Sequence, residues 1–195
     1  MKYFDWRMDA VRAGRGYHVD VGAFSTPIVG GGAGTIITID KPEFVLGVPA
    51  GTVIIPTRIH VVCEPPLIAA DDNEIEILIA ANIAAVPVSY GTATAETPTN
   101  MHTGSSNTSG CTCKSATTGA ITSPTLGMEL AHAVKVADIV LTGTAANAFW
   151  EDLSLLYEPI TPPILVGPCT LLVYWGGTVA TSGYAQVEWI EMASA

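Results

Sequence analysis

Charged side chains are scarce in this sequence of 195 residues. They make up 13% of the chain, about half the ~25% of ordinary soluble domains, while hydrophobic residues make up 49%. The high apolar content excludes an intrinsically disordered chain, because disorder requires low hydrophobicity and a high charge density. The low charge also disfavours a solitary enzyme with an ordinary solvated surface. Neutral surface of this extent is typically covered by partners, so we expect a subunit of an assembly.

A secretion signal and a membrane span are both missing from the pattern. The first ten positions hold four charged residues: Lys2, Asp5, Arg7 and Asp9. A signal peptide needs an uninterrupted apolar run there, so we expect folding in a reducing cytoplasm with the four cysteines as free thiols. The longest stretch without Asp, Glu, Lys or Arg covers 159–187, but its prolines and glycines would break a membrane helix. We therefore expect no membrane partner.

The motifs of the common enzyme classes are absent as well. The sequence contains no Gly-x-x-x-x-Gly-Lys-Ser/Thr phosphate loop and no Gly-x-Ser-x-Gly nucleophile elbow. The glycine-rich run 30–34 follows no strong strand and precedes no capped helix, which excludes a nucleotide-binding fingerprint. Metal-binding histidine pairs are three to five residues apart, and none of the four histidines has such a neighbour: His18, His60, His102 and His132. We therefore predict no enzyme, no catalytic residue and no cofactor.

One group of thiols leaves a metal-binding interpretation open. Cys111 and Cys113 form a Cys-x-Cys pair, and His102 precedes them by nine residues. Two thiolates and an imidazole can bind zinc, but a structural zinc site normally takes four ligands from recognised pairs. Two loop thiols are the favoured interpretation, and Cys63 and Cys169 are expected in the core.

A second metal-binding interpretation concerns carboxylates at alternate positions. Asp72, Glu74 and Glu76 present oxygen ligands of the kind that calcium prefers. A turn followed by the solvent face of a strand explains the same spacing, and this interpretation is favoured. We therefore predict no metal site.

Positive charge is concentrated at the start of the chain. The first sixteen residues carry four of the eight cations and two carboxylates, a side-chain charge of +2, whereas the rest carries four cations and sixteen carboxylates, or −12. A basic end on an acidic body is typical of an attachment device, the alternative being a solvated segment without a role. We therefore divide the chain into an arm over 1–34, ending in a flexible glycine joint, and a body over 35–195. The arm residues expected to contact a partner are Lys2, Phe4, Trp6, Arg7, Arg12 and Arg15.

Alternation of apolar and polar residues predicts strands over most of the body. The clearest run covers 52–64, whose alternate apolar residues share one face: Val53, Ile55, Ile59, Val61 and Cys63. Pro56 places this strand at an edge or gives it a bulge. Further strands are predicted over 35–39, 74–81 (with Ile75, Ile77 and Ile79 inward), 133–142, 171–175 and 184–192, with a weaker signal over 90–97. The pattern over 149–157 fits either a strand or a helical turn. The arm contains one short helical pattern that ends at Arg12, and the polar run 91–127 is expected to form long loops.

Seven or eight short strands joined by Gly and Pro turns predict an all-β fold. The architecture we expect is an antiparallel β-sandwich of the jelly-roll type with an extended N-terminal arm.

The end of the chain carries a resemblance to a known family. Gly167-Pro168-Cys169-Thr170-Leu171-Leu172-Val173-Tyr174 is followed by Gly176-Gly177-Thr178 and by the aromatic and acidic run 183–191. This pattern resembles the last two strands of small jelly-roll structural proteins of tailed bacteriophages. The resemblance implies a capsid decoration (cement) protein or a related head accessory protein, located on the capsid surface of the virion after synthesis in the host cytoplasm. It also implies two partners, the major capsid protein and further copies of the chain in a symmetric homo-oligomer, with a trimer expected first. No catalytic residue is carried over.

Two other functions remain as alternatives. A carbohydrate- or receptor-binding module would use the loops of 91–127 together with exposed aromatic residues. A metal-dependent enzyme with a related β-fold lacks the clustered histidines and carboxylates that its site needs. Nucleic acid is not expected as a partner, because the basic cluster is sparse and the acidic body opposes such binding.

Overall fold

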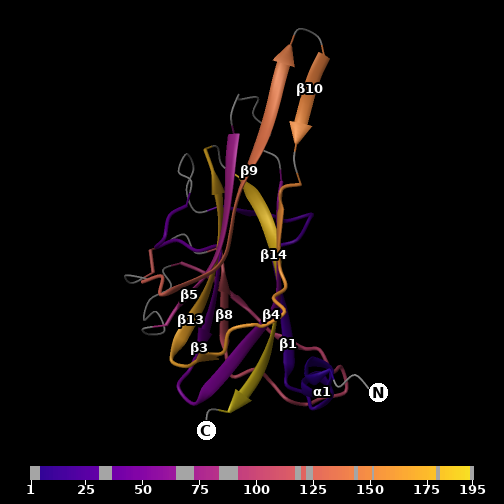
Figure 1. Ribbon diagram of the computed structural model, residues 1–195, viewed down its shortest axis with the longest axis vertical. Helices are drawn as coiled ribbons and strands as arrows, with labels where there is room; N and C mark the ends of the chain where they lie inside the picture. Colours follow the sequence, from indigo (N-terminus) through magenta and orange to yellow (C-terminus); the bar gives the residue numbers. More distant parts are fainter. Residues whose placement is uncertain are drawn as a thin grey trace.

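The computed structural model describes residues 5–30, 37–64, 73–83, 92–116, 120–121, 125–142, 145–150, 152–178 and 181–193. These residues form one short helix, α1 (Trp6–Arg12), and two antiparallel sheets (Figure 1). The first sheet contains β1 (Gly16–Val21), β2 (Ile28–Val29), β4 (Thr52–Cys63), β7 (Thr99–Asn100), β11 (Ser154–Tyr157), β12 (Leu165–Val166) and β14 (Ser182–Ala193). The second contains β3 (Phe44–Val48), β5 (Asn73–Asn82), β6 (Thr94–Glu96), β8 (Thr112–Ser115), β9 (Met128–Thr142), β10 (Ala145–Trp150) and β13 (Cys169–Gly177). The predicted all-β antiparallel sandwich is confirmed.

The order of the strands in each sheet differs from their order in the sequence. The first sheet runs β11-β4-β14-β1-β7, and the second runs β10-β9-β5-β13-β3-β8-β6. The last two strands complete both sheets, because β14 lies between β1 and β4 while β13 lies between β3 and β5. The first and the last strand, β1 and β14, are thus neighbours in one sheet, and the two ends of the chain are tied together by their pairing.

The core lies between the sheets and is built by period-two alternation. Ile75, Ile77 and Ile79 of β5 are fully buried, as predicted. Trp175 of β13 and Trp189 of β14 are among the largest fully buried side chains. Because strands of both sheets contribute to one cluster, the core rather than any single sheet holds the sandwich together.

Strand β4 contains the bulge that Pro56 predicts. Its pairing with β14 shifts register between Glu188 and Trp189, which pair with Arg58 and Pro56. The residue between them, Thr57, is therefore unpaired in the ladder. The bulge reverses which alternate residues face the core, so the expectation of one shared apolar face was wrong. Ile59, Val61 and Cys63 pack in the main core with Ile54, whereas Ile55 packs on the outer face of the sheet.

The expected arm over 1–34 differs most from the structure. The short helix ends at Arg12 as predicted, and Gly14 follows it with a φ of +67°. Strand β1, however, lies inside the first sheet between β14 and β7, and its Tyr17, Val19 and Val21 belong to the core. The sandwich therefore begins at Gly16, not at residue 35. The physical reason is that the alternation of 17–21 finds a full-length partner in β14, which pairs with six residues of β1.

The glycine joint and the weaker strand signals are tested in part. Gly30 is buried, and its N–H donates to the carbonyl of Thr181 at 2.7 Å, so this end of the run is fixed. Positions 31–34 lie outside the described residues, as do 35–36 of the strand predicted over 35–39, and 37–39 form no strand. The signal over 90–97 corresponds to β6, and that over 149–157 to the end of β10 and to β11.

Candidate interaction surface

Helix α1 begins and packs for reasons visible in its own sequence. The Asp5 carboxylate caps the helix by accepting the N–H of Arg7 at 3.0 Å. Asp9 lies in the first turn and Arg12 in the last, an arrangement that favours the helix dipole. Ala10 is the buried residue of the helix, and it packs with Ile55 and Ile190 on the outer face of the first sheet. The helix is therefore docked on the sandwich and is not a free arm.

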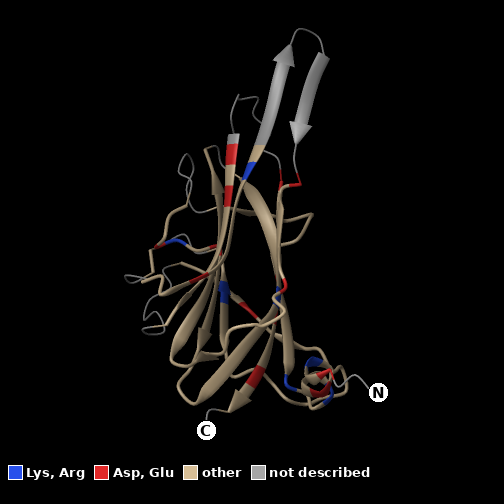
Figure 2. Ribbon diagram, viewed as in Figure 1, with Lys and Arg blue, Asp and Glu red and all other residues tan. Residues whose placement is uncertain are grey.

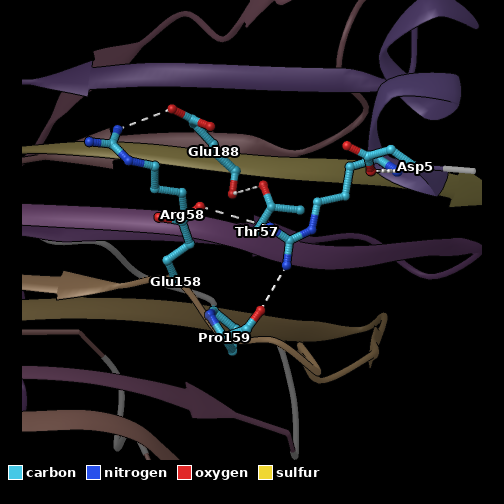
Figure 3. Close-up of polar contacts among 7 residues, drawn as sticks. Asp5, Thr57, Arg58, Glu158, Pro159 and Glu188 are labelled. Atoms are coloured by element: carbon cyan, nitrogen blue, oxygen red, sulfur yellow. Dashed lines mark hydrogen bonds and ion pairs between the residues drawn. The ribbon is translucent and has the colours of Figure 1, made fainter. Parts of the chain in front are cut away.

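Arg7 ties this helix to the segment that follows β11. Its Nη2 donates to the carbonyl of Pro159 at 2.7 Å, and its Nη1 lies 3.9 Å from the Glu158 carboxylate (Figure 3). The guanidinium also lies 5.8 Å from the centre of the Trp6 ring. Arg7 therefore uses its charge within its own chain, in contact with Trp6, Glu158 and Pro159.

A second ion pair lies beside this tether. Arg58 of β4 and Glu188 of β14 approach to 3.2 Å, and the Thr57 hydroxyl donates to the Glu188 carbonyl at 3.2 Å (Figure 3). Thr57, whose backbone is unpaired in the ladder, is thus bonded to β14 through its hydroxyl group. These contacts fix the register of β4 and β14 beneath the helix.

The six predicted contact residues have different environments in the structure. Lys2 and Phe4 lie outside the described residues. Arg7 contacts its own chain, whereas the Arg12 side chain is 75% exposed and Arg15 is exposed. Trp6 is 40% exposed at the rim of the helix. The ribbon of α1 carries both basic and acidic positions in Figure 2, so this end of the molecule is mixed in charge.

The most exposed apolar side chains of this region were not predicted. They lie on the segment that runs from β11 to β12 along the outer edge of β4, where β11 pairs with β4 near Val62 and β12 pairs near Val53. Four of them join Trp6 in what we call the edge surface, and the exposed fractions of its five members are Trp6 40%, Leu156 51%, Ile160 97%, Ile164 64% and Val166 58%. The Arg7–Pro159 bond holds the helical and strand parts of this surface together.

Prolines determine how a partner can use the edge surface. Pro159, Pro162 and Pro163 lie between β11 and β12 and cannot donate a backbone hydrogen bond. Proline at a sheet edge prevents another strand from adding to it. At the segment between β11 and β12, a partner would therefore pack against side chains rather than pair with the backbone as a strand. The signal in the sequence was an apolar, proline-rich stretch without charges, but only the structure shows which of its residues face outward.

The thiols considered for zinc lie in the core. Cys111 and Cys113 are buried, and burial is the largest cause that raises the pKa of both thiols, followed by the charge of Glu191. The pKa of Cys113 rises to about 12. Zinc binds the thiolate, so this environment opposes a metal site. His102 is exposed on the preceding loop.

The carboxylates considered for calcium do not form a common site in the described residues. Glu74 is exposed, and Glu76 lies 2.7 Å from the Nε2 of His132 on β9. Asp72 lies outside the described residues. Within the described part of the chain, no three His, Cys, Asp or Glu side chains gather in a way that could hold a metal ion.

Comparison with protein-family models, with curated proteins and with solved structures found no match for this chain. In the described residues, no helix has the length and apolar character that crossing a bilayer requires. Function is therefore inferred from the surface chemistry of the sandwich.

Replacing Arg7 tests whether the helix is tethered as described. Hydrogen bonds from charged donors contribute about 1.5–3 kcal/mol when shielded. Because Glu158 is half exposed, we expect Arg7→Ala to lower the free energy of unfolding by only about 1 kcal/mol. Arg12→Ala is the matched control, because Arg12 is 75% exposed and pairs with Asp9 at 3.9 Å. Urea denaturation should show a smaller change for the control; equal changes would mean that the tether does not stabilise the fold.

Proposed function

We propose that this chain is a structural virion protein, a capsid decoration protein that stabilises a phage head by bridging capsid subunits. The observation that carries the proposal is the edge surface, which presents five apolar side chains to solvent in a chain with only 13% charged residues. Exposed apolar patches of this kind mark protein–protein interaction sites. Trp6 adds a residue type that is enriched at the centres of binding interfaces.

The connectivity of the sandwich supports the same proposal. Four strands of the first sheet pair in the order β1-β14-β4-β11, and four of the second pair in the order β3-β13-β5-β9. This order is the one expected of a chain that folds back as two Greek keys, the connectivity of jelly rolls. Jelly rolls recur in viral capsid proteins, and also in lectins and cupins. The fold is therefore one that virion proteins use, and the choice of a virion role rests on the edge surface.

The partners proposed are the major capsid protein and further copies of this chain, with a symmetric trimer as the first expectation. Ile160 is 97% exposed, the largest exposed fraction on the edge surface, so it has the most apolar area to bury against a partner. Burying a side chain of this size in an interface contributes roughly 1.5–3 kcal/mol. Several such residues along one edge provide the apolar centre that a stable interface requires.

Ile160→Asp tests this surface. Because Ile160 is 97% exposed, the substitution should leave the fold unchanged but place a charge on the edge surface. We expect self-association, measured by analytical ultracentrifugation, to weaken at least about tenfold. We expect the same variant to stay in the supernatant when the wild-type protein sediments with phage heads that lack their own decoration protein.

Val134→Asp is the matched control, because Val134 is 54% exposed on β9 of the opposite sheet. It should associate and sediment like the wild type. A wild-type protein that stays monomeric at all concentrations and binds no head would contradict the proposal.

The loops named for the carbohydrate-binding alternative are engaged elsewhere. The side-chain amides of Asn100 and Asn107 donate to the carbonyl of Gly14, and the Ser109 hydroxyl donates to the Glu191 carboxylate. These described polar groups therefore close the loop against β1 and β14 rather than facing a ligand. Trp175 and Trp189 are buried and cannot stack on a sugar.

A further inference from the structure

A hollow of about 290 Å³ lies where β1 ends beside β14. Two aromatic residues, Phe24 and Tyr184, and two polar residues, Asp20 and Gln186, are among those that line it. It is separate from the edge surface, because it is formed by β1, β14 and the turn after β1 rather than by α1 and the β11–β12 segment. This combination of aromatic and polar groups suits a ligand with both an apolar face and hydroxyl groups.

The fold holds Phe24 in an exposed position. Gly22 leaves β1 with a φ of +69°, and Ala23 and Thr26 then exchange backbone hydrogen bonds of 3.2 and 2.9 Å. Strand β2 follows and pairs with the start of β14. Phe24 therefore lies at the tip of a tight, anchored turn, where it is 80% exposed. The backbone of the turn therefore holds the Phe24 side chain in solvent, outside the hydrophobic core.

The polar groups form a row across three strands. The Gln186 side-chain amide donates to Asp20 Oδ1 at 3.2 Å, and its carbonyl oxygen accepts from Arg58 Nη1 at 3.4 Å. Arg58 is in turn paired with Glu188. Both ends of the Gln186 amide are thus oriented before any ligand arrives. Pre-organised groups of this kind give specificity at low entropic cost.

From this geometry we propose that the hollow binds the ring of a neutral sugar. An aromatic side chain packs against the C–H face of the ring, while a carboxylate and an amide bond to its hydroxyl groups. Asp20 repels an anionic ligand, whereas the charge of Arg58, which donates to Gln186, is offset by its ion pair with Glu188. A small cation without a ring face or hydroxyl groups would leave the aromatic side chains and the Gln186 amide unused. The volume is just below the ~300–1,000 Å³ of sites for drug-sized ligands, which suits a single ring. The site does not depend on capsid decoration.

Ligand-observed saturation-transfer NMR and titration of the isotope-labelled protein test the proposal. The probes are the methyl glycosides of glucose, galactose, mannose and rhamnose, together with N-acetylglucosamine. We expect saturable binding of at least one probe in the millimolar range, with shifts confined to the backbone amides around Asp20–Phe24 and Tyr184–Gln186. The amide of Nα-acetyl-lysine serves as the cationic probe and is expected not to bind.

Two variants assign the binding to the hollow. Phe24→Ala should weaken binding about tenfold, because the stacking surface is lost, and Asp20→Asn should weaken it by removing the charged acceptor. Val134→Ala, on the opposite sheet, should bind like the wild type. Absence of saturable binding for all sugars, unchanged affinity in Phe24→Ala, or binding of the lysine amide alone would each overturn the proposal. Self-association of Phe24→Ala should be normal, which separates this test from that of the edge surface.

Discussion

Replacing Trp189 by alanine should destabilise the sandwich more than any of the other substitutions proposed for this protein. The side chain is fully buried between the sheets, its ring lies 6.0 Å from that of Tyr17, and its Nε1 donates to Glu191 at 2.9 Å. Truncating a buried tryptophan typically costs about 3–5 kcal/mol. Domains of this size are stable by only about 5–15 kcal/mol, so a large part of the stability is lost.

Urea denaturation followed by far-UV circular dichroism measures this effect. The protein concentration must be held constant, because association adds to the apparent stability. Val134→Ala is the control, since Val134 is 54% exposed, lies outside the edge surface and should cost under about 1 kcal/mol. A Trp189→Ala protein as stable as the control would mean that Trp189 does not anchor the core.

Gly30→Ala should also destabilise the fold, although the glycine lies in a run that the sequence predicts to be a flexible joint. A Cβ at this position would lie 2.4 Å from the carbonyl oxygen of Trp175 and 3.1 Å from that of Thr181. Both are backbone atoms of the sandwich, so relief requires a shift of the main chain. Overpacking of this kind costs about 1–3 kcal/mol, which corresponds to a Tm lowered by several degrees.

Gly104→Ala provides the comparison for Gly30→Ala. Its Cβ would meet nothing closer than His102 Nε2 at 3.6 Å, an ordinary van der Waals distance. We expect a change within about 0.5 kcal/mol. Thermal unfolding measures the Tm of both variants. Equal Tm values would show that the main chain around Gly30 accommodates a Cβ without loss of stability.

The strands of the interior were predictable because their alternation is strong. In β5, three isoleucines occupy alternate positions, and all three are buried. The proline in β4 also predicted an irregularity, because it cannot donate to the ladder. The sequence did not show that Thr57 would be the bulged residue, which reverses the faces of Val53 and Ile55 relative to Ile59. A one-residue slip exchanges the two faces of a strand, and its place depends on the partner strand.

The boundary between the predicted arm over 1–34 and the sandwich was wrong for a related reason. In β1, apolar Tyr17, Val19 and Val21 alternate with polar His18 and Asp20, a strand signal that the basic cluster before it and the glycines around it obscured. It becomes an inner strand because β14, at the other end of the chain, pairs with it along its whole length. The position of Arg7 follows from the same docking, which turns a residue expected to contact a partner into an internal tether.

From the order of its residues alone, this chain is committed to an all-β sandwich with few charges and without the recognised motifs of catalysis. Those properties are local, since alternation and composition act within a few residues. The tertiary structure decided which strands became neighbours, where the bulge lies, and which apolar residues stayed outside. Leu155 and Leu156 are chemically identical neighbours, yet Leu155 packs against the core and Leu156 is exposed on the edge surface. A period of two assigns side chains to opposite faces, but the face that meets water is set by what the rest of the chain covers.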